Sequence, residues 1–127
     1  AEAPGASVFE RGPFRVTAWP VDHPVPTVGL RVEAGGAVVG YSCDTAPCPN
    51  VTALARGADL LVHEATGHLP GVHSSATEAA KAATEAGARR LVLVHLPRTP
   101  LDLTEARTVF AETAVADECG SASVTAA

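Results

Sequence analysis

DLLVHEATGHLPGVHSSATEAAKAATEAGARRLVLVH, residues 59–95, contains two short apolar runs with a helical pattern between them. DLLVH at Asp59–His63 is typical of a buried strand, and RLVLVH at Arg90–His95 is too short and too rich in β-branched residues for a helix. Ser75-Ala-Thr-Glu78 is a capping box, which predicts a helix that runs to Ala86 and ends at the following glycine. The alternation of strand, helix and strand indicates an α/β fold.

The residues on the N-terminal side of this stretch are predicted to form an antiparallel β-meander over residues 7–42. Phe14–Val21 alternates well enough to be a strand. Gly29–Glu33 and Ala37–Ser42 are two further short strands, joined by a Gly-Gly pair that suits a tight hairpin.

Three shorter elements are predicted outside the meander and the strand–helix–strand unit. Asn50 is placed to cap a short helix over Val51–Arg56. Asp102-Leu-Thr-Glu105 repeats the capping-box pattern and predicts a helix that reaches about Ala114. Ser121–Thr125 is interpreted either as a last strand or as a frayed tail.

The composition describes one acidic domain. The 127 residues are enough for one hydrophobic core, and no repeat or linker divides them, so we interpret residues 1–127 as a single unit with alternating strands and helices over residues 50–125. No apolar run reaches the roughly 18 residues of a membrane span. The net charge is −5 and the basic residues are scattered, which argues against bulk affinity for nucleic acid.

The number and spacing of the cysteines indicate the redox state of the compartment in which the protein is expected. Cys43, Cys48 and Cys119 make an odd number without a Cys-x-x-Cys motif. The simplest interpretation is small buried residues in a reducing cytoplasm, and a Cys43–Cys48 bridge across the intervening turn is the alternative. The first ten residues lack the basic and apolar regions of a signal peptide, so we expect a cytoplasmic protein.

Polar side chains follow the predicted strands at their carboxyl ends, where α/β proteins bind ligands. His23, Asp44, Glu64 and His95 all hold such positions. Imidazole and carboxylate are ligands that Zn²⁺ and Mn²⁺ accept. Each residue also has a simpler interpretation, because a histidine at a strand end is more often a hydrogen-bonded packing residue and an aspartate before Thr and Pro is more often a turn former. Spacing alone suggests a metal site without establishing one.

Five motifs make the pattern more specific. They are YSCDTAPCP at Tyr41–Pro49, HEAT at His63–Thr66, HSS at His73–Ser75, LVLVHLPR at Leu91–Arg98, and His23 six residues before Gly29. In order and spacing they resemble the YSGDTxPC, HEAT, HST and LILTHISxR motifs, and the ligand histidine, of metallo-β-lactamase-fold metallohydrolases of the ribonuclease Z-like branch.

The resemblance implies a fold and a metal centre. The chain would be the C-terminal half of a four-layer αβ/βα metallo-β-lactamase sandwich. His23 would be a ligand of a first divalent metal, Asp44 would bridge two metals, and His95 would be a ligand of the second. Zinc is the first choice for both metals and manganese the second.

The resemblance also implies catalytic roles for His73 and Glu64. His73 would lie beside the substrate and stabilise or protonate the leaving oxygen, and Glu64 would fix a nearby histidine by accepting its other N–H. For Glu64 and His63, a structural role that holds two strands and a loop together is equally open. His68 matches nothing in the family pattern and is interpreted as a loop residue.

Departures from the family pattern limit what the chain is expected to do alone. The HxHxDH motif, which supplies further ligands to both metals, does not occur in these 127 residues. Three ligands, one of them shared, cannot hold two metals, so the chain carries a half-site at best and is predicted to be inactive alone. Cys43 replaces the usual glycine before the bridging aspartate, at a cost of about 1 kcal/mol if φ is positive there. Only residues 24–43 separate His23 from Asp44, which leaves no room for an RNA-gripping arm and favours a small ester or phosphodiester substrate.

Two hypotheses follow. The chain is half of a metal-dependent hydrolase, whose partner is an N-terminal half that carries HxHxDH, or it is a non-catalytic half-domain that acts as an interaction or dimerisation module. The first hypothesis predicts an apolar face for the other half and convergence of His23, Asp44 and His95. The second predicts that this face is covered, for example by a homodimer. We favour the first, because the residues that make sense only as ligands are intact.

Overall fold

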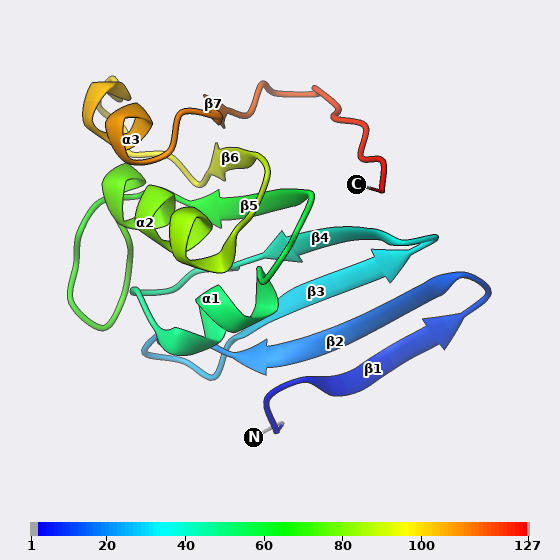
Figure 1. The fold of residues 1–127 in the computed structure, drawn as a ribbon. Coiled ribbons are helices and arrows are strands. Elements are labelled where there is room, and N and C mark those ends of the chain that lie inside the picture. Colours follow the sequence, from blue (N-terminus) through cyan, green and yellow to red (C-terminus); the bar gives the residue numbers. More distant parts are fainter. Residues whose placement is uncertain (1–2, 127) are drawn as a thin grey trace.

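One mixed seven-stranded sheet organises the molecule. The computed structural model describes residues 3–126, and its strands lie side by side in chain order (Figure 1). The antiparallel meander consists of β1 (Ala6–Arg11), β2 (Phe14–Pro20), β3 (Val28–Ala34) and β4 (Ala37–Tyr41). The parallel part consists of β5 (Leu60–Glu64), β6 (Leu91–Val94) and β7 (Thr113–Val115). The predicted α/β class is therefore confirmed.

Three helices cover one face of this sheet. They are α1 (Pro49–Leu54), α2 (Ala76–Ala86) and α3 (Thr104–Val109). The first packs on β2 and β3, the second on β5 and β6, and the third on α2 (Figure 1). No helix within residues 3–126 is long and apolar enough to cross a membrane. The core between helices and sheet consists mainly of leucine and alanine, and these small side chains let α2 lie close to the strands.

The capping box predicted for α2 is present. The Glu78 N–H donates to Ser75 Oγ at 3.1 Å, and the Ser75 N–H donates to Glu78 Oε1 at 2.9 Å. Gly87 ends the helix in the left-handed conformation, with φ 69°. Both end signals of this helix were readable because the groups that satisfy them lie within four residues of each other.

The caps predicted for the other two helices are wrong. Pro49 occupies the first turn of α1, and the Asn50 amide instead donates to the Pro20 carbonyl at 2.6 Å, tying α1 to the end of β2. At α3, Asp102 Oδ1 accepts from the Thr104 N–H at 2.9 Å and from the Thr104 hydroxyl at 2.6 Å. The Asp102 carboxylate is thus used in an Asx turn, and no side chain caps α3.

The C-terminal elements also differ from the prediction. Helix α3 ends at Val109 rather than near Ala114, and Phe110 is already extended, with φ −141°. Thr113–Val115 form β7 beside β6, where the β-branched Thr113 and Val115 fit a strand better than a helix end. The strand considered at Ser121–Thr125 is not present; these residues have no regular secondary structure.

Helix α1 lies very close to the sheet at Gly29. A Cβ at this position would lie 2.5 Å from Leu54 Cδ2 and 2.8 Å from the Tyr41 carbonyl oxygen. The second of these atoms belongs to the backbone of the neighbouring strand and cannot rotate away. Any side chain at Gly29 therefore has to push α1 or β4 out of place.

Gly29→Ala is expected to lower the free energy of unfolding by about 1–3 kcal/mol, the usual size of an overpacking effect. Urea denaturation followed by circular dichroism measures it. Gly35→Asn is the matched control, because Gly35 faces open space and asparagine tolerates its positive φ of 57°. Equal stability of the two variants would mean that the contact at Gly29 is not tight.

The face of the sheet opposite the helices is apolar and only partly buried. Gly40 and Leu61 point toward α1, so their neighbours along the strands point the other way. The apolar cross-strand partners on this helix-free face include Phe14, Val16, Ala18, Leu30, Val32, Ala34, Ala37, Val39, Tyr41, Leu60, Val62, Val92 and Val94, and Glu64 ends β5 on the same face. Phe14 is 51% exposed and Tyr41 38% exposed. Such a continuous apolar surface is typical of a face that packs against another layer.

Candidate metal centre

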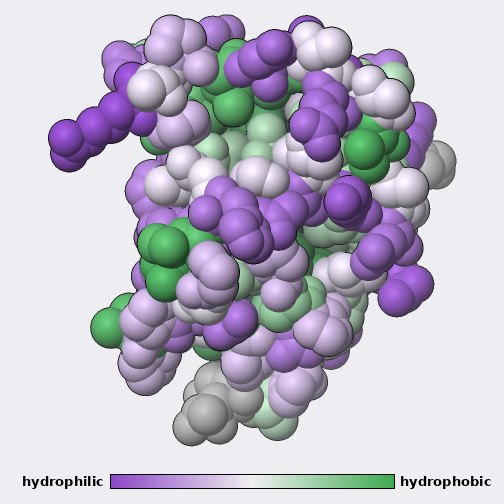
Figure 2. Space-filling model, turned by 90° about the vertical axis from the view of Figure 1, so that its left-hand side faces the viewer, coloured by the Kyte–Doolittle hydropathy of each residue, from purple (hydrophilic) through white to green (hydrophobic). Residues whose placement is uncertain are grey.

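Four strands bring polar residues to one edge of the sheet. Strands β2, β4, β5 and β6 all run toward the left edge in Figure 1. His23 and Asp44 follow the first two, Glu64 is the last residue of β5, and His95 follows β6. His73 comes from the loop between β5 and α2. Figure 2 looks onto this edge and shows hydrophilic residues gathered across its middle, with separate hydrophobic patches at its sides.

Asp44 and His95 are in direct contact. His95 Nδ1 lies 2.9 Å from Asp44 Oδ1, and the two side chains are 47% and 41% exposed. An ionised carboxylate only accepts, so Nδ1 carries the proton and the Nε2 lone pair of His95 is left for another partner. The Thr66 hydroxyl donates to the His95 carbonyl at 2.9 Å and holds the backbone of this residue.

Glu64 is buried beneath His73 and receives four hydrogen bonds. Its Oε1 accepts from His73 Nδ1 and from the Thr45 N–H, both at 2.7 Å. Its Oε2 accepts from the N–H groups of Thr66 and Ser74, both at 3.3 Å. The carboxylate thus fixes the ring of His73 and also joins a strand end to a loop, so its contacts combine the two alternatives that the sequence left open.

His23 extends this group through His73. The rings of His23 and His73 have centroids 5.4 Å apart, and those of His73 and His95 are 5.3 Å apart. The Val72 carbonyl accepts a hydrogen bond from His23 Nδ1 at 2.9 Å, which leaves Nε2 of His23 for a ligand. Three imidazoles therefore lie in a row, each with one nitrogen held by a protein oxygen.

The donor set suits a divalent metal ion. The potential ligand atoms of Glu64, His73 and His95 all lie within 4.8 Å of one another. This set shares only His95 with the set that the family resemblance implies. Because the oxygens of Glu64 already accept four N–H groups, we attribute its closeness to the hydrogen bond with His73 rather than to metal binding. Nε2 is the free nitrogen of His23, His73 and His95 alike, and the ligand set of His23, Asp44 and His95 stays a prediction.

Two supporting residues went unrecognised in the sequence. Thr45 is fully buried, and its hydroxyl accepts from the Asp22 N–H at 3.1 Å, linking the segment of His23 to that of Asp44. Ser74 is also fully buried and donates to the Thr45 carbonyl at 2.7 Å. Both lie inside the quoted motifs, but only the fold reveals that they join three segments far apart in the chain.

Two residues at this edge have left-handed backbone conformations. Cys43 has φ 55°, as expected for a position where the family has glycine, so its side chain costs about 1 kcal/mol. His95 has φ 47°, which no sequence signal indicated. Cys43 precedes Asp44, and His95 is hydrogen-bonded to Asp44, so the backbone strain is concentrated where the proposed ligands are held.

The remaining histidines lie outside this group. His63 points to the helix side of β5, is 1% exposed, and donates from Nδ1 to the Glu64 carbonyl at 2.7 Å. Burial lowers the pKa of His63, so its ring is neutral at pH 7. His68 is exposed in the loop and lies 3.0 Å from Glu78 Oε1, which agrees with its interpretation as a loop residue.

Comparison with known proteins gives a consistent family. Residues 3–96 match the family described as beta-lactamase superfamily domain. Ribonuclease Z of Methanothermobacter thermautotrophicus is 44% identical over 105 residues, which are 74% of this chain and 34% of that protein.

Two solved structures are similar as well. The metallo-β-lactamase fold protein YhfI from Bacillus subtilis has a TM-score of 0.78 at 30% identity, over 90% of this chain and 50% of that one. The short form of human tRNase Z has a TM-score of 0.63 at 30% identity, over 72% of this chain and 39% of that one. The chain spans about a third of the length of the curated relatives that it matches. It therefore belongs to the β-lactamase superfamily, as a partial, ribonuclease Z-like member with the metallo-β-lactamase fold.

Proposed function

We propose that this chain is the ligand-bearing C-terminal half of a metal-dependent hydrolase that cleaves phosphodiesters or related esters. The observation that carries the proposal is the convergence of Asp44, His73 and His95 from separate segments onto one sheet edge. His23 would bind the first metal, Asp44 would bridge, and His95 would bind the second. Zn²⁺, or Mn²⁺ as the second choice, would supply an activated water and polarise the scissile group.

His73 would serve the leaving group in this proposal. Glu64 holds its Nδ1, so Nε2 is the atom free to face a substrate. A proton on Nε2 can be donated to the departing oxygen, while the buried carboxylate stabilises the charged ring. Glu64 is then a positioning residue that acts only through His73.

The helix-free face supports the enzyme half over an independent module. A module that functions alone should cover its apolar face, whereas Phe14 and Tyr41 are substantially exposed there. A second layer that carries HxHxDH would bury this surface and add the ligands that the 127 residues do not contain. A homodimer through the same face is the alternative, and it would make the chain an interaction module.

Two observations narrow the proposed substrate class, one for the bond that is cleaved and one for the size of the substrate. The similar proteins named ribonuclease Z and tRNase Z favour a phosphodiester over a carboxylic ester. The net charge of −5 favours a small substrate over a polyanion. We therefore propose a small phosphodiester, acted on in the cytoplasm. Three free cysteines support this compartment.

Metal content tests the ligand assignment. In a protein completed by the other half, Asp44→Ala should lose both ions, because a bridging carboxylate serves each of them. His23→Ala and His95→Ala should each retain at most about one ion. Metal analysis after dialysis gives the stoichiometry, and circular dichroism checks the fold. Two retained ions in all three variants would overturn the assignment.

A further inference from the structure

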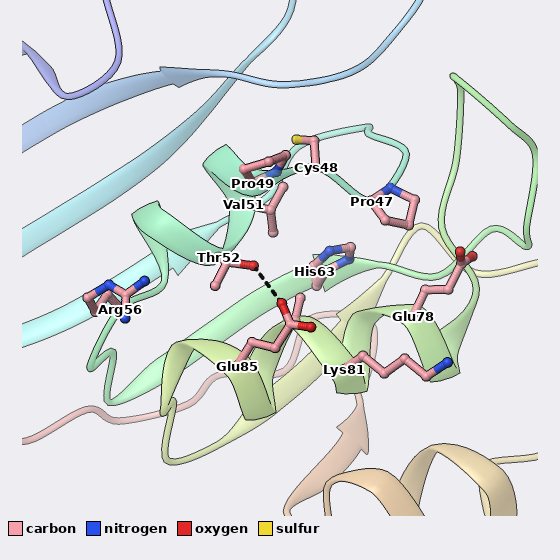
Figure 3. A pocket seen from close by; sticks show the side chains of 11 residues that line it. Pro47, Cys48, Pro49, Val51, Thr52, Arg56, His63, Glu78, Lys81 and Glu85 are labelled. Atoms are coloured by element: carbon pink, nitrogen blue, oxygen red, sulfur yellow. Dashed lines mark hydrogen bonds between the residues drawn. The ribbon is translucent and has the colours of Figure 1, made fainter.

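A hollow lies on the helix-covered side of the sheet. It has a volume of about 550 Å³ and lies between α1 and α2 (Figure 3). His63 lines it, so it lies on the face of β5 opposite to that of the next residue, Glu64. This volume is in the range of small-molecule sites. Pro47, Pro49 and Val51 form an apolar wall, so the hollow has an apolar part as well as charged groups at its rim.

A buried histidine with one unused nitrogen lines this hollow. His63 is 1% exposed, and its Nδ1 proton is donated to the Glu64 carbonyl at 2.7 Å. Nε2 of His63 has no hydrogen-bond partner within residues 3–126. In the same residues no fully enclosed side-chain nitrogen or oxygen lacks a partner, so Nε2 is not sealed and opens toward the hollow. The neutral ring offers a lone pair there, which calls for an N–H or O–H donor.

Two basic and two acidic residues line the hollow, namely Arg56, Lys81, Glu78 and Glu85, and within residues 3–126 only Glu78 of these lies in an ion pair, with His68. Lys81 and Glu85 are four residues apart on α2, hence adjacent on the helix surface, and Arg56 follows α1. The ion pairs of the described residues include none of these three. Glu85 makes only a long hydrogen bond of 3.4 Å with the Thr52 hydroxyl, drawn as the dashed line in Figure 3. Figure 3 shows the Lys81 ammonium extending along α2 away from the Glu85 carboxylate, so the two charges lie at different places in the hollow and suit a ligand that carries both.

We propose that this hollow binds a zwitterionic α-amino acid with an apolar side chain. The carboxylate would meet Lys81, the ammonium group would donate to Glu85 and to His63 Nε2, and the side chain would lie on the wall formed by Pro47, Pro49 and Val51. An anion alone would meet Glu85 unfavourably, and a cation alone would meet Lys81 in the same way. The site is separate from the metal edge, so this binding does not depend on the proposed hydrolase activity.

Matched probes test the zwitterion directly. L-phenylalanine is expected to bind the 127-residue chain with a Kd of about 1 mM or tighter, measured by NMR titration. 3-Phenylpropanoate lacks the ammonium group and 2-phenylethylamine lacks the carboxylate, so each should bind at least about 10-fold more weakly, as expected for loss of a charge-assisted hydrogen bond. Equal binding of all three probes would overturn the proposal.

Variants locate the binding. Lys81→Gln and Glu85→Gln change exposed side chains, so the fold should be retained, and each should weaken L-phenylalanine at least about 10-fold. Arg11→Gln removes the same charge as Lys81→Gln from an exposed strand far from the hollow and should change nothing. Absence of binding at 10-fold above the expected Kd, or binding that both α2 variants leave unaffected, would overturn the proposal.

Discussion

Addition of a polypeptide that carries the HxHxDH segment is expected to raise hydrolysis of bis(p-nitrophenyl) phosphate at least about 10³-fold, a modest part of the acceleration typical of enzymes. The chain alone should be no faster than buffer. It offers either metal at most two ligands, His23 with Asp44 or Asp44 with His95, whereas a protein Zn²⁺ site normally has at least three. Metal analysis after dialysis and a turnover assay, with and without the added half, measure both effects.

The same polypeptide with both leading histidines of HxHxDH changed to alanine is the matched control. It should cover the helix-free face without restoring metal or turnover. Two tightly held ions and full turnover in the 127-residue chain alone would refute the half-site. His63 opens on the opposite side of β5 and His68 is engaged with Glu78, so the missing ligands would then have to come from a second copy.

His73→Ala in the completed protein is expected to lower kcat by about 10²-fold, the usual size of general-acid assistance. Metal content should not change, because His73 is not among the proposed ligands. The buried Glu64 carboxylate holds Nδ1 of this ring at 2.7 Å, so the orientation of the imidazole is already fixed before substrate binds. The measurements are steady-state kinetics and metal analysis on the same samples.

His68→Ala is the control for this prediction. His68 lies in the same loop, is exposed, and is hydrogen-bonded to Glu78, which Ser75 also holds in the capping box of α2, so its removal should leave kcat and metal content unchanged. Equal loss of metal and activity in His73→Ala would make His73 a structural residue or a ligand. A lower pH optimum without loss of kcat would also contradict a general-acid role, since the proton donor would then be another group.

Local sequence signals were sufficient to predict a helix whose end groups are hydrogen-bonded by residues nearby in the chain. Helix α2 begins and ends where its capping box and its C-terminal glycine predict, since the groups involved are neighbours in the chain. Asn50 and Asp102 looked equally suitable as caps. Asn50 bonds instead to the Pro20 carbonyl, thirty residues away in sequence, and Asp102 bonds to Thr104. A side chain with two available partners cannot be assigned until the fold places both of them.

At the candidate site, too, the sequence predicted which residues share the edge but not the hydrogen bonds between them. The strand ends predicted that Asp44, Glu64 and His95 would share an edge, because side chains at the carboxyl ends of parallel strands meet there. The hydrogen bonds that order the edge were not predictable. The left-handed backbone of His95 and the buried contacts of Thr45 and Ser74 depend on three segments meeting, and no short motif encodes that meeting.

The sequential strand order has a consequence for how this chain folds. Each strand pairs with its neighbour in the chain, so the β-meander forms by short loop closures and β5 to β7 are added one at a time. The hairpins of the meander are local, so assembly can begin at the N-terminal edge during synthesis, whereas the parallel pairs of β4 to β7 need crossover connections and form more slowly. All seven strands of the described sheet come from this chain, so pairing of the strands needs no second polypeptide. The apolar helix-free face is then exposed, and aggregation through it would compete with docking of the proposed second layer.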